Sequence, residues 1–124
     1  MTLLTFKKEE RLTNKKAFEL LFNSGKSFVL SPFRLVWIET KSTSAFPVQL
    51  GISVPKKSFQ KASDRNKLKR RIRESYRKNK HTLYEKLKKK NLHIALMVIY
   101  IAKNQLSYQE IERKMILSLQ KVIT

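Results

Sequence analysis

Cysteine is absent from the 124-residue chain, and glycine (two), histidine (two) and acidic residues (nine) are scarce. Without cysteine the protein forms neither a disulfide nor a cysteine-based zinc site, and no thiol can act as a nucleophile. This agrees with a reducing cytoplasm, where we expect the protein to work. Two glycines are too few for a glycine-rich phosphate loop. The scattered acids include no DxD or ExxE pair of the kind that holds magnesium.

Long apolar stretches are also missing. The longest apolar run, residues 94–102, has nine residues, whereas a membrane-spanning helix needs roughly twenty. The first eleven residues carry Glu9 and Glu10 and no long apolar stretch, so they do not look like a signal peptide. We expect no membrane segment, and a flexible polar arm at residues 1–10.

Positive charge is what the chain has in excess. It contains 28 Lys and Arg residues against nine Asp and Glu residues, for a formal net charge of +19. Self-repulsion of this size opposes a compact state unless a polyanion relieves it. Nucleic acid is the first candidate partner, and an anionic membrane surface is the second.

Hydrophobic periodicity predicts a single domain, residues 1–124, with its elements in the order α-β-β-(β)-α-β-α. The first helix has apolar positions at residues 17, 18, 21 and 22, a cap at Thr13 or Asn14, and Gly25 at its C-terminal end. Alternating apolar residues predict strands at residues 33–38 and 48–54, paired as a hairpin around a turn at residues 41–47.

The C-terminal third of the chain supplies the rest of the fold. Residues 94–101 are apolar on both faces, which is typical of a central strand. Ser107 and Glu110 form a capping box that opens the last helix. Together these elements predict an α+β two-layer sandwich, with one mixed sheet and helices packed against it.

A long basic helix is expected at about residues 63–80, with a break near residues 79–81 and a continuation beyond it. Residues 56–80 hold twelve basic side chains and two acidic ones. On a helical wheel an apolar stripe of Leu68, Ile72 and Tyr76 separates two basic flanks. Docking of this stripe on the sheet turns the flanks outward, where they suit the phosphates of an RNA backbone. The alternatives are a solvated charged face and a helix that enters the DNA major groove.

Three residues each allow two interpretations. Asn66 contacts a base or a 2′-hydroxyl, or it binds backbone near the start of its helix. Phe18 and Phe22, four residues apart on one helical face, either pack in the core or form a platform on which unpaired bases stack.

The segment ASDRNKLKRRIRE (residues 62–74), preceded by Lys56 and Lys57, resembles the signature of the bacterial ribonuclease P protein family. That signature is an Ala, two variable residues, Arg-Asn-Arg, an aliphatic residue and a Lys/Arg-Arg pair. Here Lys67 stands in the place of the second Arg, which keeps the charge but not the bidentate geometry. The resemblance extends over roughly residues 11–123, including Arg11-Leu12 and the strand Gly51-Ile52-Ser53-Val54.

The resemblance implies a fold like that of ribosomal protein S5 domain 2, with a left-handed βαβ crossover. It also implies a subunit of an endoribonuclease that removes the 5′ leader of precursor tRNA. The expected partners are the catalytic RNA and the 5′ leader of precursor tRNA, with one protein per catalytic RNA. The catalytic RNA is expected to bind most of the Mg2+ and to carry out catalysis. The residues implied to bind the catalytic RNA are Lys56, Lys57, Arg65, Asn66, Lys67, Lys69, Arg70 and Arg73. Those implied to bind the leader, in a cleft between the first helix and the sheet, are Arg11, Phe18 and Phe22.

The residues themselves argue against a protein active site. Neither His81 nor His93 has a carboxylate or nucleophile at a suggestive spacing. We expect no catalytic residue and no metal ligand in the chain. The competing classes are a structural ribosomal protein, a DNA-binding nucleoid or transcription protein, and a protein nuclease.

Overall fold

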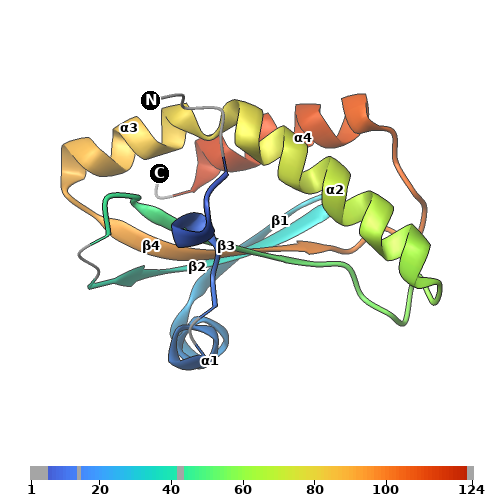
Figure 1. Cartoon of the computed structure of the whole chain (residues 1–124), viewed down its shortest axis with the longest axis horizontal. Coiled ribbons are helices and arrows are strands. Elements are labelled where there is room, and N and C mark those ends of the chain that lie inside the picture. The colour runs from blue at the N-terminus through green and yellow to red at the C-terminus, as the bar shows by residue number, and fades with distance from the viewer. Residues whose placement is uncertain (1–5, 14, 42–43, 123–124) are drawn as a thin grey trace.

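The computed structural model describes residues 6–13, 15–41 and 44–122. Within these residues one mixed four-stranded sheet carries helices on both faces, which confirms the predicted α+β class (Figure 1). Helices α2, α3 and α4 cover one face, and α1 lies across the other (Figure 1). The elements are η1 (Lys8–Glu10), α1 (Lys15–Ser24), β1 (Lys26–Leu30), β2 (Phe33–Thr40), β3 (Val48–Ser53), α2 (Ala62–Asn79), α3 (His81–Lys90), β4 (His93–Tyr100) and α4 (Tyr108–Lys121). Over the same residues, none of the helices combines the length and apolar character needed to span a bilayer.

The strand order is β1-β2-β4-β3, with β3 parallel to β4 and the other pairs antiparallel. The expected hairpin between residues 33–38 and 48–54 is wrong, because β4 inserts between these two strands and pairs with both. The hairpin partner of β2 is instead β1. Alternation of apolar residues identifies strands but not their partners, whereas the two buried faces of β4 correctly indicated a central position.

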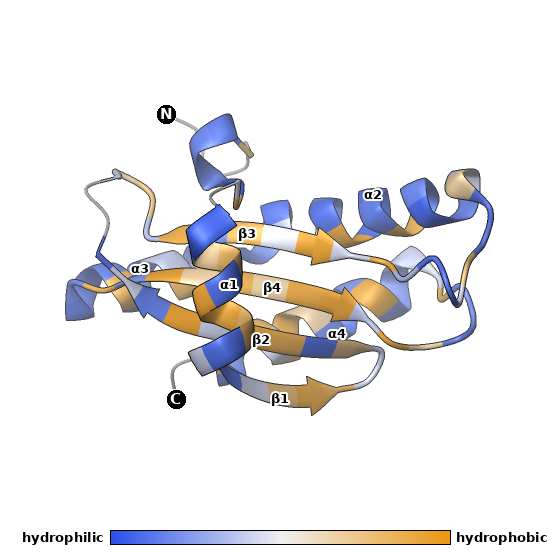
Figure 2. Cartoon of the chain, turned by 90° about the horizontal axis from the view of Figure 1, so that it is seen from below, coloured by the Kyte–Doolittle hydropathy of each residue, from blue (hydrophilic) through white to orange (hydrophobic). Residues whose placement is uncertain are grey.

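The connection from β3 to β4 through α2 and α3 is a left-handed crossover. In Figure 2, β3 and β4 point the same way, β4 lies on the β1 side of β3, and α2 to α4 lie behind the sheet. Seen from the helical side with the strands pointing up, the chain therefore moves leftward from β3 to β4, against the usual rule. This handedness is the one that the family resemblance implied.

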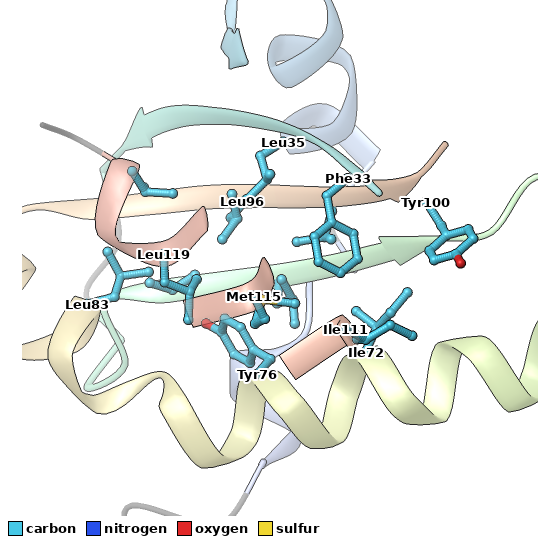
Figure 3. Packing of buried hydrophobic residues seen from close by; sticks show 14 of the residues in the cluster. Phe33, Leu35, Ile72, Tyr76, Leu83, Leu96, Tyr100, Ile111, Met115 and Leu119 are labelled. Atoms are coloured by element: carbon cyan, nitrogen blue, oxygen red, sulfur yellow. The ribbon is translucent and has the colours of Figure 1, made fainter. Parts of the chain in front are cut away.

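Buried side chains fill both sides of the sheet. On the helical side, Phe33 and Leu96 pack with Ile72 and Tyr76 of α2 and Met115 of α4 (Figure 3). The apolar stripe predicted for the basic helix is fully buried there. A smaller cluster lies under α1 and includes Leu12, Leu21, Val36, Ala95 and Met97.

Two predicted caps can be compared with the structure. The Ser107 hydroxyl accepts a hydrogen bond from the Glu110 N–H at 3.3 Å and so opens α4 as expected. Gly25 follows the last residue of α1, where a Cβ would lie 2.3 Å from the Leu21 carbonyl oxygen. The turn from α1 into β1 therefore requires glycine. Asn14, one of the two candidate caps of α1, lies outside the described residues.

The predicted flexible arm needs correction for residues 6–10, while residues 1–5 lie outside the described residues. Glu10 is fully buried and forms an ion pair with Lys80. The Leu12 N–H donates to the Leu50 carbonyl at 2.8 Å, so the segment follows β3. It passes from the helical layer, across the β3 edge, to α1 on the opposite face (Figure 1). No local pattern predicts this arrangement, because the partner of Glu10 lies 70 residues away in the chain.

Candidate nucleic-acid interface

A cleft of about 400 Å³ opens at the β3 edge of the sheet, between α1 and α2. Its floor includes Gly51 of β3 and Met97 of β4, and Phe18 of α1 forms one side. A Cβ at residue 51 would lie 2.8 Å from the Met97 Cε, so a larger residue here would displace Met97 from the floor of the cleft. Three cations from two other elements complete the cleft, namely Arg11 before α1 and Lys69 and Arg73 on α2. The structure therefore brings two predicted leader residues together with two predicted RNA-binding residues.

A second cavity of about 210 Å³ lies on the α1 face of the sheet, nearer to β1, and Phe22 and Arg34 line it. The strand register aligns the two cavities. Gly51 pairs with Met97, Met97 pairs with Val36, and Val36 pairs with Ser27, so one row of residues crosses all four strands. The first two residues of this row line the larger cavity and the last two line the smaller one. We call the two cavities together the α1 groove.

The two phenylalanines of α1 have different surroundings. Phe18 is half-buried and packs on the cluster under α1, so its core and surface interpretations coexist. Phe22 is 60% exposed, and a residue so open contributes little to the core. Because they are four residues apart, both rings project from the same side of α1, one into each cavity.

The remaining predicted RNA-binding residues lie outside the α1 groove. Asn66, Lys67 and Arg70 are exposed on α2, and Lys56 and Lys57 are exposed on the loop between β3 and α2. We call these five residues the outer basic surface.

Arg65 has a role that the sequence did not indicate. Its Nη1 donates hydrogen bonds to the carbonyl oxygens of Phe59 and Gln60, both at 2.8 Å. Part of its guanidinium thus holds the loop between β3 and α2. Because this loop carries Lys56 and Lys57, Arg65 orders two residues of the outer basic surface from within.

Several cations on α2 contact other groups of the protein. The Arg71 Nη1 donates to the Leu106 carbonyl at 2.7 Å. The Lys78 ammonium lies 5.5 Å from the ring centroid of Tyr108. Arg77 forms an ion pair with Glu74, and this hydrogen-bonded contact lowers the pKa of the Glu74 carboxyl. These cations join α2 to the start of α4 or to their own helix, so the α4-facing flank is largely structural.

The described residues do not fit a magnesium site. Over residues 6–13, 15–41 and 44–122, there is no group of three or more His, Asp or Glu side chains that could hold a metal ion. The His93 Nε2 lies 2.9 Å from the Ser44 carbonyl oxygen, at the start of β4 and away from the α1 groove. No step of the chemistry is therefore assigned to a metal held by this chain.

Sequence reasoning missed several residues of the α1 groove. Phe6 falls in the predicted arm, Thr13 is predicted only as a candidate cap of the first helix, and Arg34 only as part of a strand. Arg34 had a signal: it alternates with the core residues Phe33 and Leu35, so it faces the α1 side of the sheet. Phe6 had none, because its contact with Tyr76 depends on the tertiary fold.

The fold and the groove define a class of protein: a small, strongly basic α+β domain with a left-handed crossover and a cationic groove beside its first helix. Within this class, the model of the Ribonuclease P family matches residues 6–123, so the chain belongs to the ribonuclease P protein family. The ribonuclease P protein component of Porphyromonas gingivalis is 33% identical over 116 residues, which cover 93% of this chain and 84% of the relative. That of Dictyoglomus turgidum is 41% identical over 85 residues, which cover 68% of each chain.

Solved structures agree with this assignment. The RNase P protein from Thermotoga maritima superposes with a TM-score of 0.74 at 28% identity, covering 93% of this chain and 99% of that one. The RNase P protein of Staphylococcus aureus superposes with a TM-score of 0.64 at 27% identity, covering 93% and 98% of the two chains. The chain is therefore a component of an endoribonuclease.

Replacing Arg65 tests its role in the loop. Arg65→Ala removes both hydrogen bonds to loop carbonyls, so amide exchange at Ser58 and Phe59 should accelerate and the free energy of unfolding should fall by ~1–3 kcal/mol. The control, Arg70→Ala, removes the same charge from an exposed site on the same helix and should leave both quantities nearly unchanged. Hydrogen exchange that is equally fast in both variants would contradict the assignment.

Proposed function

We propose that this chain is the protein subunit of ribonuclease P, and that it binds both the catalytic RNA and the 5′ leader of precursor tRNA. The complex contains one protein per RNA and acts in the cytoplasm. Bond cleavage, and the Mg2+ that it needs, belong to the RNA. The α1 groove is the observation that carries this proposal, because it joins aromatic rings and cations along one line across the sheet.

The α1 groove suits a single strand of nucleic acid. Binding of unpaired strands combines a cationic path for the backbone with aromatic rings on which bases stack, each worth ~1–3 kcal/mol. Phe18 and Phe22 stand about one helical turn apart and offer ring faces to successive bases. Arg11, Lys69 and Arg73 supply positive charge in the larger cavity, and Arg34 supplies it in the smaller one. An unpaired 5′ leader is a strand of this kind.

The outer basic surface is assigned to the catalytic RNA. Its side chains are exposed, and they lie on a helix and loop whose positions are fixed by the core and by Arg65. Arg70 presents a planar guanidinium that matches a phosphate or a base edge, whereas Lys67 contributes a point charge. Asn66, exposed between them, is placed to contact a base or a 2′-hydroxyl.

The two surfaces together explain how a protein without a catalytic cluster assists cleavage. The catalytic RNA and the precursor tRNA repel each other, and a cationic protein bound to both lowers the cost of bringing them together. Holding the leader also fixes the substrate beside the catalytic RNA, which converts binding energy into positioning.

The direct test compares cleavage of precursor tRNA by the catalytic RNA of the same organism, with and without this protein. We expect the protein to accelerate leader removal most at low Mg2+, where the RNAs are least screened. No acceleration at any Mg2+ concentration, or cleavage by the protein alone, would defeat the proposal.

Removal of a stacking ring should weaken leader binding selectively. Phe22→Ala deletes a ring that is 60% exposed, so it should lower affinity for a long-leader precursor by ~1–3 kcal/mol while leaving mature tRNA binding unchanged. The matched control is Val29→Ala, which removes another exposed apolar side chain, 61% accessible, from β1. Equal losses for precursor and mature tRNA would show that Phe22 does not contact the leader.

Removal of a cation from the outer basic surface should change the salt dependence of binding to the catalytic RNA. Arg70→Ala should reduce the slope of log affinity against log salt by about one unit, because one phosphate contact is lost. The control is Lys89→Ala, at an exposed position near the end of α3. It removes the same charge outside the outer basic surface and should leave the slope unchanged. Identical slopes for the two variants would place the RNA elsewhere.

A further inference from the structure

Two charged side chains are buried in the part of the chain that the structure describes: Glu10, 0% exposed, and Lys80, 3% exposed. They form an ion pair between η1 and the junction of α2 with α3. The Glu10 carboxylate also accepts hydrogen bonds from the Tyr84 hydroxyl and from the Lys7 N–H, both at 2.7 Å. The Tyr76 hydroxyl donates to that of Tyr84 at 3.2 Å. Burial raises the pKa of both tyrosines, so each keeps the proton that it donates.

This network fastens residues 6–13, which we call the N-terminal strap, to the helical layer. The Phe6 ring meets Tyr76 edge-on at 5.9 Å, and the Lys80 ammonium lies 5.8 Å from the Phe6 centroid. A second attachment lies further along the strap, where the Leu12 N–H bonds to the Leu50 carbonyl of β3 at 2.8 Å. The strap is thus held at both ends.

The N-terminal strap forms one wall of the larger cavity of the α1 groove, and α2 forms the facing wall. The strap contributes Arg11, and α2 contributes Lys69 and Arg73. Residue 11 follows the buried carboxylate directly in the chain. The position of Glu10 therefore sets where Arg11 stands relative to the cations of α2.

The attachment offsets electrostatic repulsion between the N-terminal strap and α2. The strap carries the cations Lys7, Lys8 and Arg11 and the acids Glu9 and Glu10, and it lies against α2, the most basic helix of the chain. Like charges at close range repel. Glu10 supplies a negative charge at the point of contact, so the two cationic walls stay together before any anionic strand enters.

A buried ion pair is a weak means of gaining stability, since an apolar pair of the same volume often serves as well. The ion pair instead fixes the position of the strap relative to α2 and α3. The Glu10 carboxylate meets one ammonium, one hydroxyl and one backbone N–H, and these contacts are satisfied together in a single arrangement. An apolar contact would tolerate sliding of the strap.

We propose that Glu10 and Lys80 are positioning residues for leader recognition: their buried ion pair holds the N-terminal strap so that Arg11 faces Lys69 and Arg73 across the α1 groove. This proposal rests on the proposed function, because it assumes that the leader occupies that groove. Preorganised walls bind a strand without the cost of ordering them first.

The experiment uses the complex of this protein with the catalytic RNA and two precursor tRNAs, one with a long 5′ leader and one with a single leader nucleotide. Glu10→Gln keeps the shape of the side chain and removes its charge. We expect it to weaken binding of the long-leader substrate about tenfold, while binding of the short-leader substrate and of the catalytic RNA changes less than twofold. The control is Glu9→Gln, an exposed neighbour in the same turn with the same change in charge, which should behave like the unaltered protein.

A second variant separates positioning from stability. Glu10→Met with Lys80→Met and Tyr84→Phe replaces the polar contacts by apolar groups of similar volume, a change that proteins often tolerate without loss of stability. We expect it to melt near the temperature of the unaltered protein and still to lose the long-leader substrate selectively. In the free protein, spin labels on cysteines introduced at Lys8 and Ser63 should show a broader distance distribution for both altered proteins, since the native chain has no cysteine to interfere.

Each outcome is decisive. Long-leader affinity within twofold of the unaltered protein, in either Glu10→Gln or the apolar variant, would overturn the positioning role. An equal loss for both substrates would overturn it as well, because it would indicate a folding defect alone. If the unaltered protein does not increase affinity for the long-leader substrate over the short-leader substrate, the proposed function itself is wrong, whatever the Glu10 variants do.

Discussion

The constraint on which this structure depends is the crowding of positive charge around one groove. A chain with a net charge of +19 places the cations of α2 opposite those of the N-terminal strap. The core holds α2 in place through its buried apolar stripe, and the buried Glu10 carboxylate, with the Phe6 ring against Tyr76, holds the strap against it. Cations that pair internally, such as Arg71 with the Leu106 carbonyl, hold α4. The remaining positive charge is left on two surfaces for anionic partners.

The left-handed crossover gives these surfaces their arrangement. It brings α2 over the helical face of the sheet while its basic flank reaches the β3 edge, where the strap passes from one layer to the other (Figure 1). The larger cavity of the α1 groove lies at this edge, where Lys69 and Arg73 of α2 line it together with Arg11 and Phe18. One helix therefore serves both surfaces, with Lys69 and Arg73 in the groove and Asn66, Lys67 and Arg70 outside it. We infer that this shared helix is what couples the leader to the catalytic RNA.

Many elements of the fold could be predicted from the sequence, because a local pattern of a few residues determines each of them. The stripe of Leu68, Ile72 and Tyr76, the doubly buried β4 and the Ser107 cap all follow from periodicity and capping within a few residues. What failed depended on contacts between distant segments. Alternation could not show that β4 separates β2 from β3, and composition could not show that Glu10 pairs with Lys80. The charge of Arg65 likewise gave no sign that its guanidinium faces the loop carbonyls. The family resemblance implied one cleft for Arg11 and Phe18, but only the fold showed that Lys69 and Arg73 line it too.

The central claim is that the α1 groove holds the leader while the outer basic surface holds the catalytic RNA. Directed hydroxyl-radical cleavage tests it most directly, because an iron chelate can be attached to a single introduced cysteine in a chain that has none. The probe at Thr13→Cys, on the wall of the groove, should cut the 5′ leader, and the probe at Lys67→Cys, on the outer surface of α2, should cut the catalytic RNA. An uncut leader with the probe at residue 13, or the same cleavage pattern from both positions, would contradict the account.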